Sequence, residues 1–382
     1  MIRRRSYLFP ALRMASPLVA AISLRRLFPY STASNPPAGF VAEEFLVTKC
    51  GLTPSKALRA SRYRAHLKSP SNPEAVIDFL TDMGLDKADI AAAVARKSQI
   101  LCSRVDETLI PRFAQLRNMG LTPLQISRLI TIIPDIMSSS LMISRLAFYI
   151  SFLSSYEKVH AVLRRSYYFL NQDVERVVKP NITFLQQYGM TDCDIGKLFK
   201  LAPGMIILEP ERVKEIVSCA EKIGIPRDSS MFKHALASIY NISPGRVNSR
   251  SNLLMKTLGC SEAELGMAVR KFPYILNSTE DRLSRSVDFL VRKVGLEPNY
   301  IAHRPSLLAR SMTRRLVPRH FILETLKAKG LMKKDKDFFT VVIKSEKKFH
   351  NMFLDPYKES VPGFADAYVA ACAGQVPPLV LP

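Results

Sequence analysis

The chain contains no tryptophan, and acidic residues are scarce for its length of 382 residues. Its 33 Asp and Glu residues stand against 55 Lys and Arg residues, which leaves a formal net charge of +22. The first 42 residues hold six arginines and no acid, so 49 of the basic residues lie in the remainder. This imbalance favours polyanionic partners, because a strong positive field attracts negatively charged polymers whatever the fold.

Several other patterns are missing, and each absence removes a class of function. The six cysteines are dispersed without CxxC spacing, so we predict reduced, mostly buried thiols rather than a disulfide framework or zinc site. No run of 18 apolar residues occurs, so no membrane-spanning helix is predicted. The chain also lacks a phosphate-binding glycine loop and a nucleophile elbow, and its six histidines are scattered. We therefore expect a binding protein that is not an enzyme and uses no metal or cofactor.

Residues 1–40 have the composition of an organellar transit peptide, because they are rich in arginine, contain serine and carry no acid. A cationic amphipathic leader responds to an inside-negative membrane potential, which favours the mitochondrial matrix; a chloroplast is the alternative. A secretory signal fits less well, since Arg25 and Arg26 stand where a small-residue cleavage site is needed. We expect this leader to be disordered and to be cleaved within residues 28–40.

The chain is rich in one internal repeat, a glycine followed by an apolar residue at intervals near 35 residues or twice that. The glycines are Gly51, Gly84, Gly120, Gly189, Gly224, Gly259, Gly295 and Gly330. The double interval after Gly120 indicates one degenerate copy near Ser155. A period of this length is typical of a solenoid, in which each unit buries its apolar face against its neighbours.

A second marker, a Pro-x-apolar-apolar turn, keeps step with the glycines. Within residues 259–294, Gly259 ends one helix, a Ser261–Glu264 capping box starts the next, and Pro273 breaks it before a helix from about Glu280. Each copy is thus two helices joined by a corner. The sequence predicts an all-α superhelical solenoid of about eight such units over residues 41–360, with no strand. Residues 361–382, which carry little charge, are predicted to be a C-terminal tail.

Arginines recur at a fixed phase, nine positions after the start of five consecutive turns. They are Arg176, Arg212, Arg246, Arg282 and Arg314, where the turn before Arg246 is taken to start at Ala237. Further candidates beside them are Arg250, Arg285, Arg315 and Arg319. Equivalent positions face one side of a solenoid, so we predict that these nine arginines contact nucleic-acid phosphates. Ordinary solvated helix surface is the alternative.

The basic window 310–350 is either a nucleic-acid contact or a polar cap. The aromatic run 167–169 either stacks on bases or belongs to the core.

The turn, the Gly-Leu ending and the two-helix unit resemble the mitochondrial transcription termination factor (mTERF) family. Residues 271–276 and 303–308 are the clearest copies, and the resemblance covers about 45–360. The run 353–358, Phe-Leu-Asp-Pro-Tyr-Lys, resembles the end of organellar plant members. The turn proline is missing from the copies at Gln99, Tyr167 and Ala237, which leaves their local geometry less well specified.

The resemblance implies a crescent of helical repeats whose basic concave groove holds nucleic acid, mostly duplex DNA. It further implies a role in transcription termination, transcriptional regulation, intron splicing or ribosomal RNA maturation. We predict an organellar protein that binds double-stranded DNA as a monomer and regulates transcription, with transcription or ribonucleoprotein factors as partners. The alternatives are an RNA-binding factor for splicing or ribosomal RNA maturation, and a protein–protein scaffold. A pentatricopeptide array also has a period near 35, but its helix pairs lack the Pro-x-apolar-leucine corner.

Overall fold

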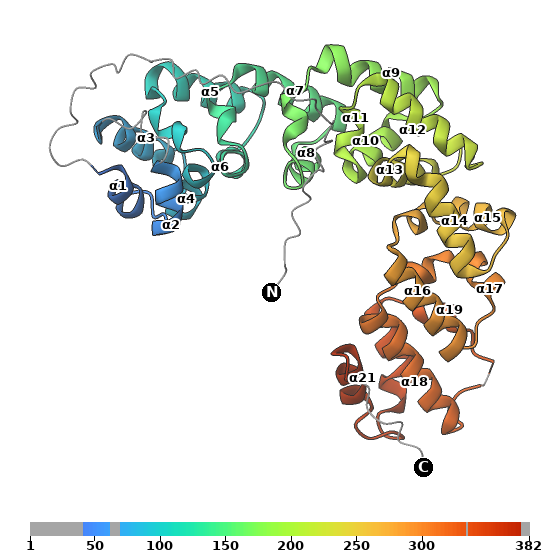
Figure 1. Ribbon diagram of the computed structural model, residues 1–382. Coiled ribbons are helices and arrows are strands. Elements are labelled where there is room, and N and C mark those ends of the chain that lie inside the picture. The colour runs from blue at the N-terminus through green and yellow to red at the C-terminus, as the bar shows by residue number, and fades with distance from the viewer. Residues whose placement is uncertain (1–40, 62–68, 334, 376–382) are drawn as a thin grey trace, which may run out of the picture.

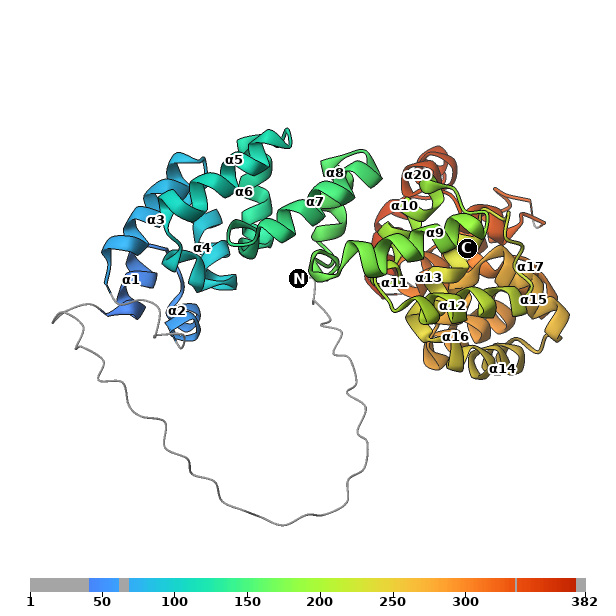
Figure 2. The ribbon, with the colours of Figure 1, turned by 90° about the horizontal axis from the view of Figure 1, so that it is seen from above.

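A computed structural model describes residues 41–61, 69–333 and 335–375 of the chain (Figure 1). The predicted leader at 1–40 and the last residues of the predicted tail, 376–382, lie outside the described residues. Within the described ranges every regular element is a helix and none is a strand, which confirms the all-α prediction. The helices form an arc, with α1–α6 in one limb and α14–α21 in the other (Figure 1). From above, α7 and α8 lie between α1–α6 and the group formed by the later helices (Figure 2).

Each unit consists of a first helix, a short corner and a second helix. The first helices are α2 (Pro54–Ser61), α4 (Lys87–Arg96), α6 (Pro123–Ile132), α8 (Tyr156–Leu163), α10 (Asp192–Leu201), α13 (Phe232–Ile242), α15 (Glu262–Lys271), α17 (Pro298–His303) and α19 (Phe338–Val342). The second helices are α3 (Ser71–Asp82), α5 (Ile110–Asn118), α7 (Ser140–Leu153), α9 (Lys179–Gln187), α12 (Pro210–Lys222), α14 (Val247–Leu258), α16 (Glu280–Asp288), α18 (Val317–Ala328) and α20 (Glu346–Phe353). The corners are η2 (Ser98–Cys102), η4 (Pro134–Met137), η5 (Tyr168–Asn171), α11 (Pro203–Ile206), η7 (Pro244–Arg246), η8 (Pro273–Asn277) and η10 (Pro305–Ala309). Helices α1 (Ala42–Thr48) and α21 (Phe364–Cys372) stand at the two ends, and η12 (Asp355–Tyr357) follows α20.

The unit built from α15 and α16 agrees closely with its prediction. Gly259 caps α14 in the left-handed conformation at φ 63°, and both bonds of the Ser261–Glu264 capping box are present. After Pro273, the side chains of Ile275 and Leu276 enter the core and keep only 2% and 1% of their exposed surface. Each corner therefore holds the chain in place by burying its apolar pair between neighbouring units.

The glycine marker corresponds to the turn between a second helix and the next first helix. All eight repeat glycines have positive φ, and the degenerate copy is Ser154, one residue before the predicted position, with φ 56°. A left-handed backbone is costly for a residue with a β-carbon, which explains why glycine fills this position elsewhere. The apolar residues on both sides of these turns belong to one hydrophobic core that runs along the arc.

Three second helices begin with a π-helical turn that sequence analysis did not anticipate. These turns are η3 (Val105–Leu109), η6 (Val174–Val178) and η11 (Met312–Leu316), and each ends two residues before a proline. Proline cannot donate a backbone hydrogen bond and crowds the carbonyl four residues earlier, and a wider turn accommodates both effects. A fourth π-helical turn, η9 (Phe289–Lys293), extends α16 without a proline.

Two predicted boundaries differ from the structure. The turn placed at Ala237 lies inside α13, and the corner comes at Pro244, because buried residues continue the helix through Ile239. Within the predicted tail, α21 packs against α18 and buries Phe364 and Tyr368. The packed helices therefore extend beyond residue 360.

Candidate nucleic-acid interface

The corners of the units lie together along one side of the arc, here called the corner edge. It comprises the corners, the last turn of each first helix and the first turn of each second helix. Consecutive corners touch in the pairs η2–η4, η5–α11 and η8–η10. The repeat glycines lie at the other end of every helix pair and define the opposite, glycine edge.

Neighbouring units are connected by polar side chains that run along the corner edge. From α7, Arg145 donates to the carbonyl of Leu170 at 3.0 Å, and from α9 the Asn181 amide donates to Ile206 at 2.8 Å. Asn72, Arg250, Arg282 and Arg319 make the equivalent bonds from α3, α14, α16 and α18. In each case a second helix donates to carbonyl groups of the next unit, in or beside its corner or, for Arg319, at the end of α19, because the last carbonyls of a short helix lack partners within the helix.

Four of the five in-phase arginines occupy one structural position. Arg176, Arg212, Arg282 and Arg314 are each the third residue of a second helix or of the π turn that begins it, and all four are exposed. Arg246 differs, because its corner starts at Pro244 rather than Ala237. It is also exposed, but it ends η7 and precedes α14.

The exposed arginines fall into two groups by what they contact. Within the described residues, the side chains of Arg176, Arg246 and Arg314 form no hydrogen bond or ion pair. Arg212 instead pairs with Glu215 at 2.5 Å, and Arg285 pairs with Asp281. A cation with an acid one turn away has less net attraction for phosphate, so the first group has the greater capacity to bind.

A carboxylate also lies near Arg176. The backbone N–H groups of Arg176 and Glu175 hold the pKa of Asp173 below its usual value, and the charges of Arg145 and Arg176 act in the same direction. Asp173 is therefore ionised at neutral pH and caps the π turn η6, in which Arg176 lies.

The remaining candidates have structural contacts. Arg282 remains exposed while donating to Ala309 at 2.6 Å, and Arg250 is half-buried and donates to Ser278 at 3.4 Å. Arg315 is half-buried near Arg310. The prediction for Arg319 is wrong, because its side chain is fully buried and donates to three backbone carbonyls and to Glu346. A guanidinium that is enclosed in this way cannot reach a phosphate.

Sequence analysis missed a second set of cations on the corner edge, at the C-terminal ends of the first helices. This set comprises Arg96, Lys97, Arg164, Arg165, Lys200, Arg270, Lys271 and Arg304. Two of them contact the next unit, since Arg165 donates to the backbone carbonyl of Lys200 and Lys271 donates to the backbone carbonyl of His303. Their signal was a basic residue at or just after the end of a first helix, where it also complements the helix dipole; α6 and α13 have none in their last turns.

Acids lie on both edges. The N-terminal turns of the first helices place Asp86, Asp89, Asp192, Asp194, Glu262 and Glu264 on the glycine edge. The first turns of the second helices place Asp106, Glu107, Glu175, Glu211, Glu280 and Asp281 on the corner edge. The basic window 310–350 is divided between the edges, because it is as long as one unit. Its arginines 310–315 lie at a corner, whereas Lys327 and Lys329 lie beside the turn at Gly330.

The aromatic run contributes to both core and surface. Phe169 is fully buried and packs edge-on against Tyr149 and Phe199. Tyr168 is 62% exposed and stacks on Tyr167 with ring centroids 5.0 Å apart. One stacked aromatic pair therefore lies on the corner edge, at the start of η5.

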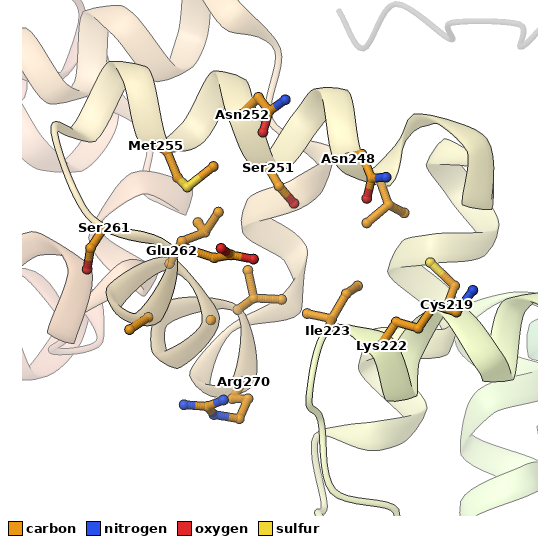
Figure 3. A pocket seen from close by; sticks show the side chains of 15 residues that line it. Cys219, Lys222, Ile223, Asn248, Ser251, Asn252, Met255, Ser261, Glu262 and Arg270 are labelled. Atoms are coloured by element: carbon orange, nitrogen blue, oxygen red, sulfur yellow. The ribbon is translucent and has the colours of Figure 1, made fainter.

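A hollow of about 990 Å³ lies between α12, α14 and α15 (Figure 3). Asn248, Ser251 and Asn252 line it from α14, with Glu262 from α15. Glu262 is the one carboxylate among its lining residues, and no histidine is among them. Across the described part of the chain, no group of three or more His, Cys, Asp or Glu side chains is arranged to hold a metal.

None of the described helices combines the length and the apolar character needed to cross a membrane.

Two relatives from Arabidopsis thaliana match the chain. Transcription termination factor MTERF8, chloroplastic, is 23% identical over 69% of this chain and 52% of its own length. Transcription termination factor MTERF15, mitochondrial, is 24% identical over 48% of this chain and 41% of its own length. The chain thus spans about half the length of these relatives. The mTERF family model matches residues 74–350, which run from within α3 to within α20. With its two-helix units, its corners and this match, the chain belongs to the mTERF family.

Proposed function

We propose that this protein binds duplex DNA along its corner edge and regulates transcription in an organelle, the mitochondrion being the favoured compartment. The observation that carries the proposal is the exposed arginine at the third position of the second helix in four units. The names of the two relatives, both transcription termination factors of organelles, support the regulatory part. A bound protein would impede or direct the polymerase by occupying its path.

The chemistry of the corner edge suits a polymer with evenly spaced negative charges. Arg176, Arg246 and Arg314 offer guanidinium groups without acid partners among the described residues, and the cations at the ends of α4, α8, α10, α15 and α17 add a second set. Backbone contacts of this kind fix register on a duplex but carry no base information. Sequence choice would then come from a few side chains at base edges or from the deformability of the duplex. The concave location of the groove remains a prediction.

The test is a titration of the full chain against one sequence presented as duplex DNA, duplex RNA and single-stranded RNA, at several salt concentrations. If five to eight phosphates are neutralised, the log–log salt slope for duplex DNA should be about −4 to −7. Arg176→Gln and Arg314→Gln should each reduce the magnitude of this slope by about 1. Arg292→Gln is the matched control, because Arg292 is paired with Asp288 near the glycine edge. A slope near zero would exclude the electrostatic mechanism.

A second candidate function is RNA binding, which the exposed Tyr168 on Tyr167 favours. An aromatic face beside cations is a platform on which unpaired bases can stack. Tyr168→Ala should then weaken single-stranded RNA binding more than duplex DNA binding. If no nucleic acid binds, the corner edge serves an acidic protein partner instead, as in the scaffold alternative.

A further inference from the structure

An open recess of about 460 Å³ lies where the last corner meets the C-terminal helices. Ser311, Arg314 and Arg315 line it from the start of the α18 segment, Glu346 from α20 and Cys372 from α21. Helix α21 is essential to this recess, since it forms one wall and is held against α18 by the buried side chains of Phe364 and Tyr368. The recess therefore combines two arginines from a repeat corner with a wall that no other unit has.

The positive charge at this place is not compensated by the protein. Burial lowers the pKa of Arg310, and the charges of Arg315 and Arg319, which lie close enough to repel it, act in the same direction. The Nε–H of Arg310 is buried without a hydrogen-bond partner. The Arg314 side chain has no acid partner among the described residues. Like charges held together in a half-buried place are unfavourable unless an anion joins them.

Glu346 lines the recess but does not neutralise these arginines. One of its carboxylate oxygens accepts from Arg319 at 2.8 Å, and the other accepts from Tyr368 at 2.6 Å. Both oxygens thus accept hydrogen bonds from buried side chains, those of Arg319 and Tyr368. Its charge is paired with the buried Arg319, and its Oε1 also lies 3.6 Å from His350 Nε2. Among the described residues, Arg310, Arg314 and Arg315 are therefore left without an acid of their own.

We propose that this recess is a binding site for a single phosphate group, held by Arg314, Arg315 and the Ser311 hydroxyl. Arginine suits this ligand, because its planar fork donates two parallel hydrogen bonds to phosphate oxygens. The inference rests on the proposed nucleic-acid function and deepens it: the phosphate would be a diester of a bound strand or the monoester at a strand end. In either form it would anchor one end of the strand at the last unit.

The first experiment measures thermal unfolding of the full chain in inorganic phosphate, against chloride at the same ionic strength. The wild type should show a saturable rise in Tm, because a ligand that binds only the folded state stabilises it by mass action. Arg314→Ala combined with Arg315→Ala should weaken the apparent phosphate affinity at least tenfold. Arg292→Ala, which removes an exposed cation elsewhere, should leave it unchanged. Equal responses in all three proteins would overturn the proposal.

The change in Tm on substitution of Arg315 has opposite signs for an anion site and for a merely structural role. Without phosphate and at low salt, Arg315→Gln should raise Tm, because it removes a charge that repels Arg310. An arginine that stabilises the fold through its own contacts would lower Tm on substitution. A fall in Tm for Arg315→Gln would therefore count against an uncompensated anion site.

The source of the phosphate is distinguished with duplexes that differ only in a 5′-phosphate or 5′-hydroxyl end. If the wild type binds the 5′-phosphate duplex more tightly than the 5′-hydroxyl duplex and the double variant loses this preference, the recess binds a strand end. If the wild type binds both duplexes equally and the double variant binds both more weakly, the recess binds a diester. If inorganic phosphate binds at the recess but no duplex or RNA binds the wild type, the phosphate site is supported and the proposed function is wrong. If nucleic acid binds and the double variant has the same affinities as Arg292→Ala, the proposed function is supported and the phosphate site is wrong.

Discussion

The buried Nη2 of Arg319 lies 2.8 Å from Glu346 Oε2, in a contact that joins α18 to α20. The other terminal nitrogen, Nη1, donates to the carbonyls of Val341, Val342 and Lys344, while the ring of Phe349 lies 4.3 Å from the guanidinium carbon. One side chain thus satisfies the acceptors at and just after the end of α19 and connects α18 to α20.

Replacing Arg319 by methionine should destabilise the fold by about 3 kcal/mol, because it leaves buried carbonyls without donors and Glu346 without its cation. Urea unfolding followed by circular dichroism measures this change. Arg285→Ala is the control, since its pair with Asp281 is exposed and contributes less than about 1 kcal/mol. Similar losses for both variants would contradict a structural role for Arg319.

The stability of this region should depend on acid pH through Glu346. Burial raises the pKa of its carboxyl, but hydrogen bonds from Tyr368 and Arg319 and the Arg319 charge outweigh burial, so the pKa lies below its usual value. A lowered carboxyl pKa contributes stability above the unfolded value near 4.3, and this contribution is lost as pH falls through the folded value. Unfolding from pH 6 to 3 should therefore show a shallower decline for Glu346→Gln than for wild type. The exposed Glu359→Gln should follow the wild-type curve.

Glu215→Gln should strengthen nucleic-acid binding. Glu215 lies 2.5 Å from Arg212 and occupies a guanidinium that would otherwise meet phosphate. Removing the carboxylate frees Arg212 and eliminates a repulsion, with an expected gain of about 0.5 kcal/mol, or roughly twofold in Kd at low salt. Fluorescence anisotropy with duplex DNA measures the gain. Glu297→Gln, near the glycine edge, should leave Kd unchanged; an equal gain there would mean that only net charge matters.

Backbone conformation at the glycine edge can be tested by exchanging residues. Ser154→Gly should stabilise the fold by about 0.5–1 kcal/mol, because Ser154 has φ 56°. Gly259→Ala should cost about 1 kcal/mol from backbone strain alone, since no atom lies within 4 Å of the added β-carbon. Gly245→Ala is the control: its φ is not positive and its surroundings are equally open, so no loss is expected.

Local signals predicted most of the fold. The Ser261–Glu264 cap and the turn at Gly259 depend on residues within a few positions, so their spacing alone was sufficient. The corner at Pro244 was misplaced because α13 begins later in its unit, after the turns at residues 226–231, and its buried residues near Ala237 imitated a corner pair. No proline marked the false position, whereas one marked the true corner.

The candidate site was less predictable, because the same residue type has opposite roles at neighbouring positions. Arg314 and Arg319 are five residues apart on one segment, yet the first is exposed and the second fully buried. What separates them is the position of Val341, Val342 and Lys344, more than twenty residues downstream. Spacing within one unit cannot report contacts that depend on how the next unit packs.

The bonds that second helices donate to the next unit along the corner edge all run in one direction. Each of these donors precedes its acceptors in the chain, by 31 residues for Asn72 and Ser103 and by 22 for Arg319 and Val341. A chain synthesised from its N-terminus therefore exposes each donor before its acceptors exist. Folding on the ribosome must then proceed one unit behind synthesis, and a chain that stops before residue 341 leaves Arg319 with nothing to bind. Completion of the arc thus depends on its last residues, although most of its helices form from local signals.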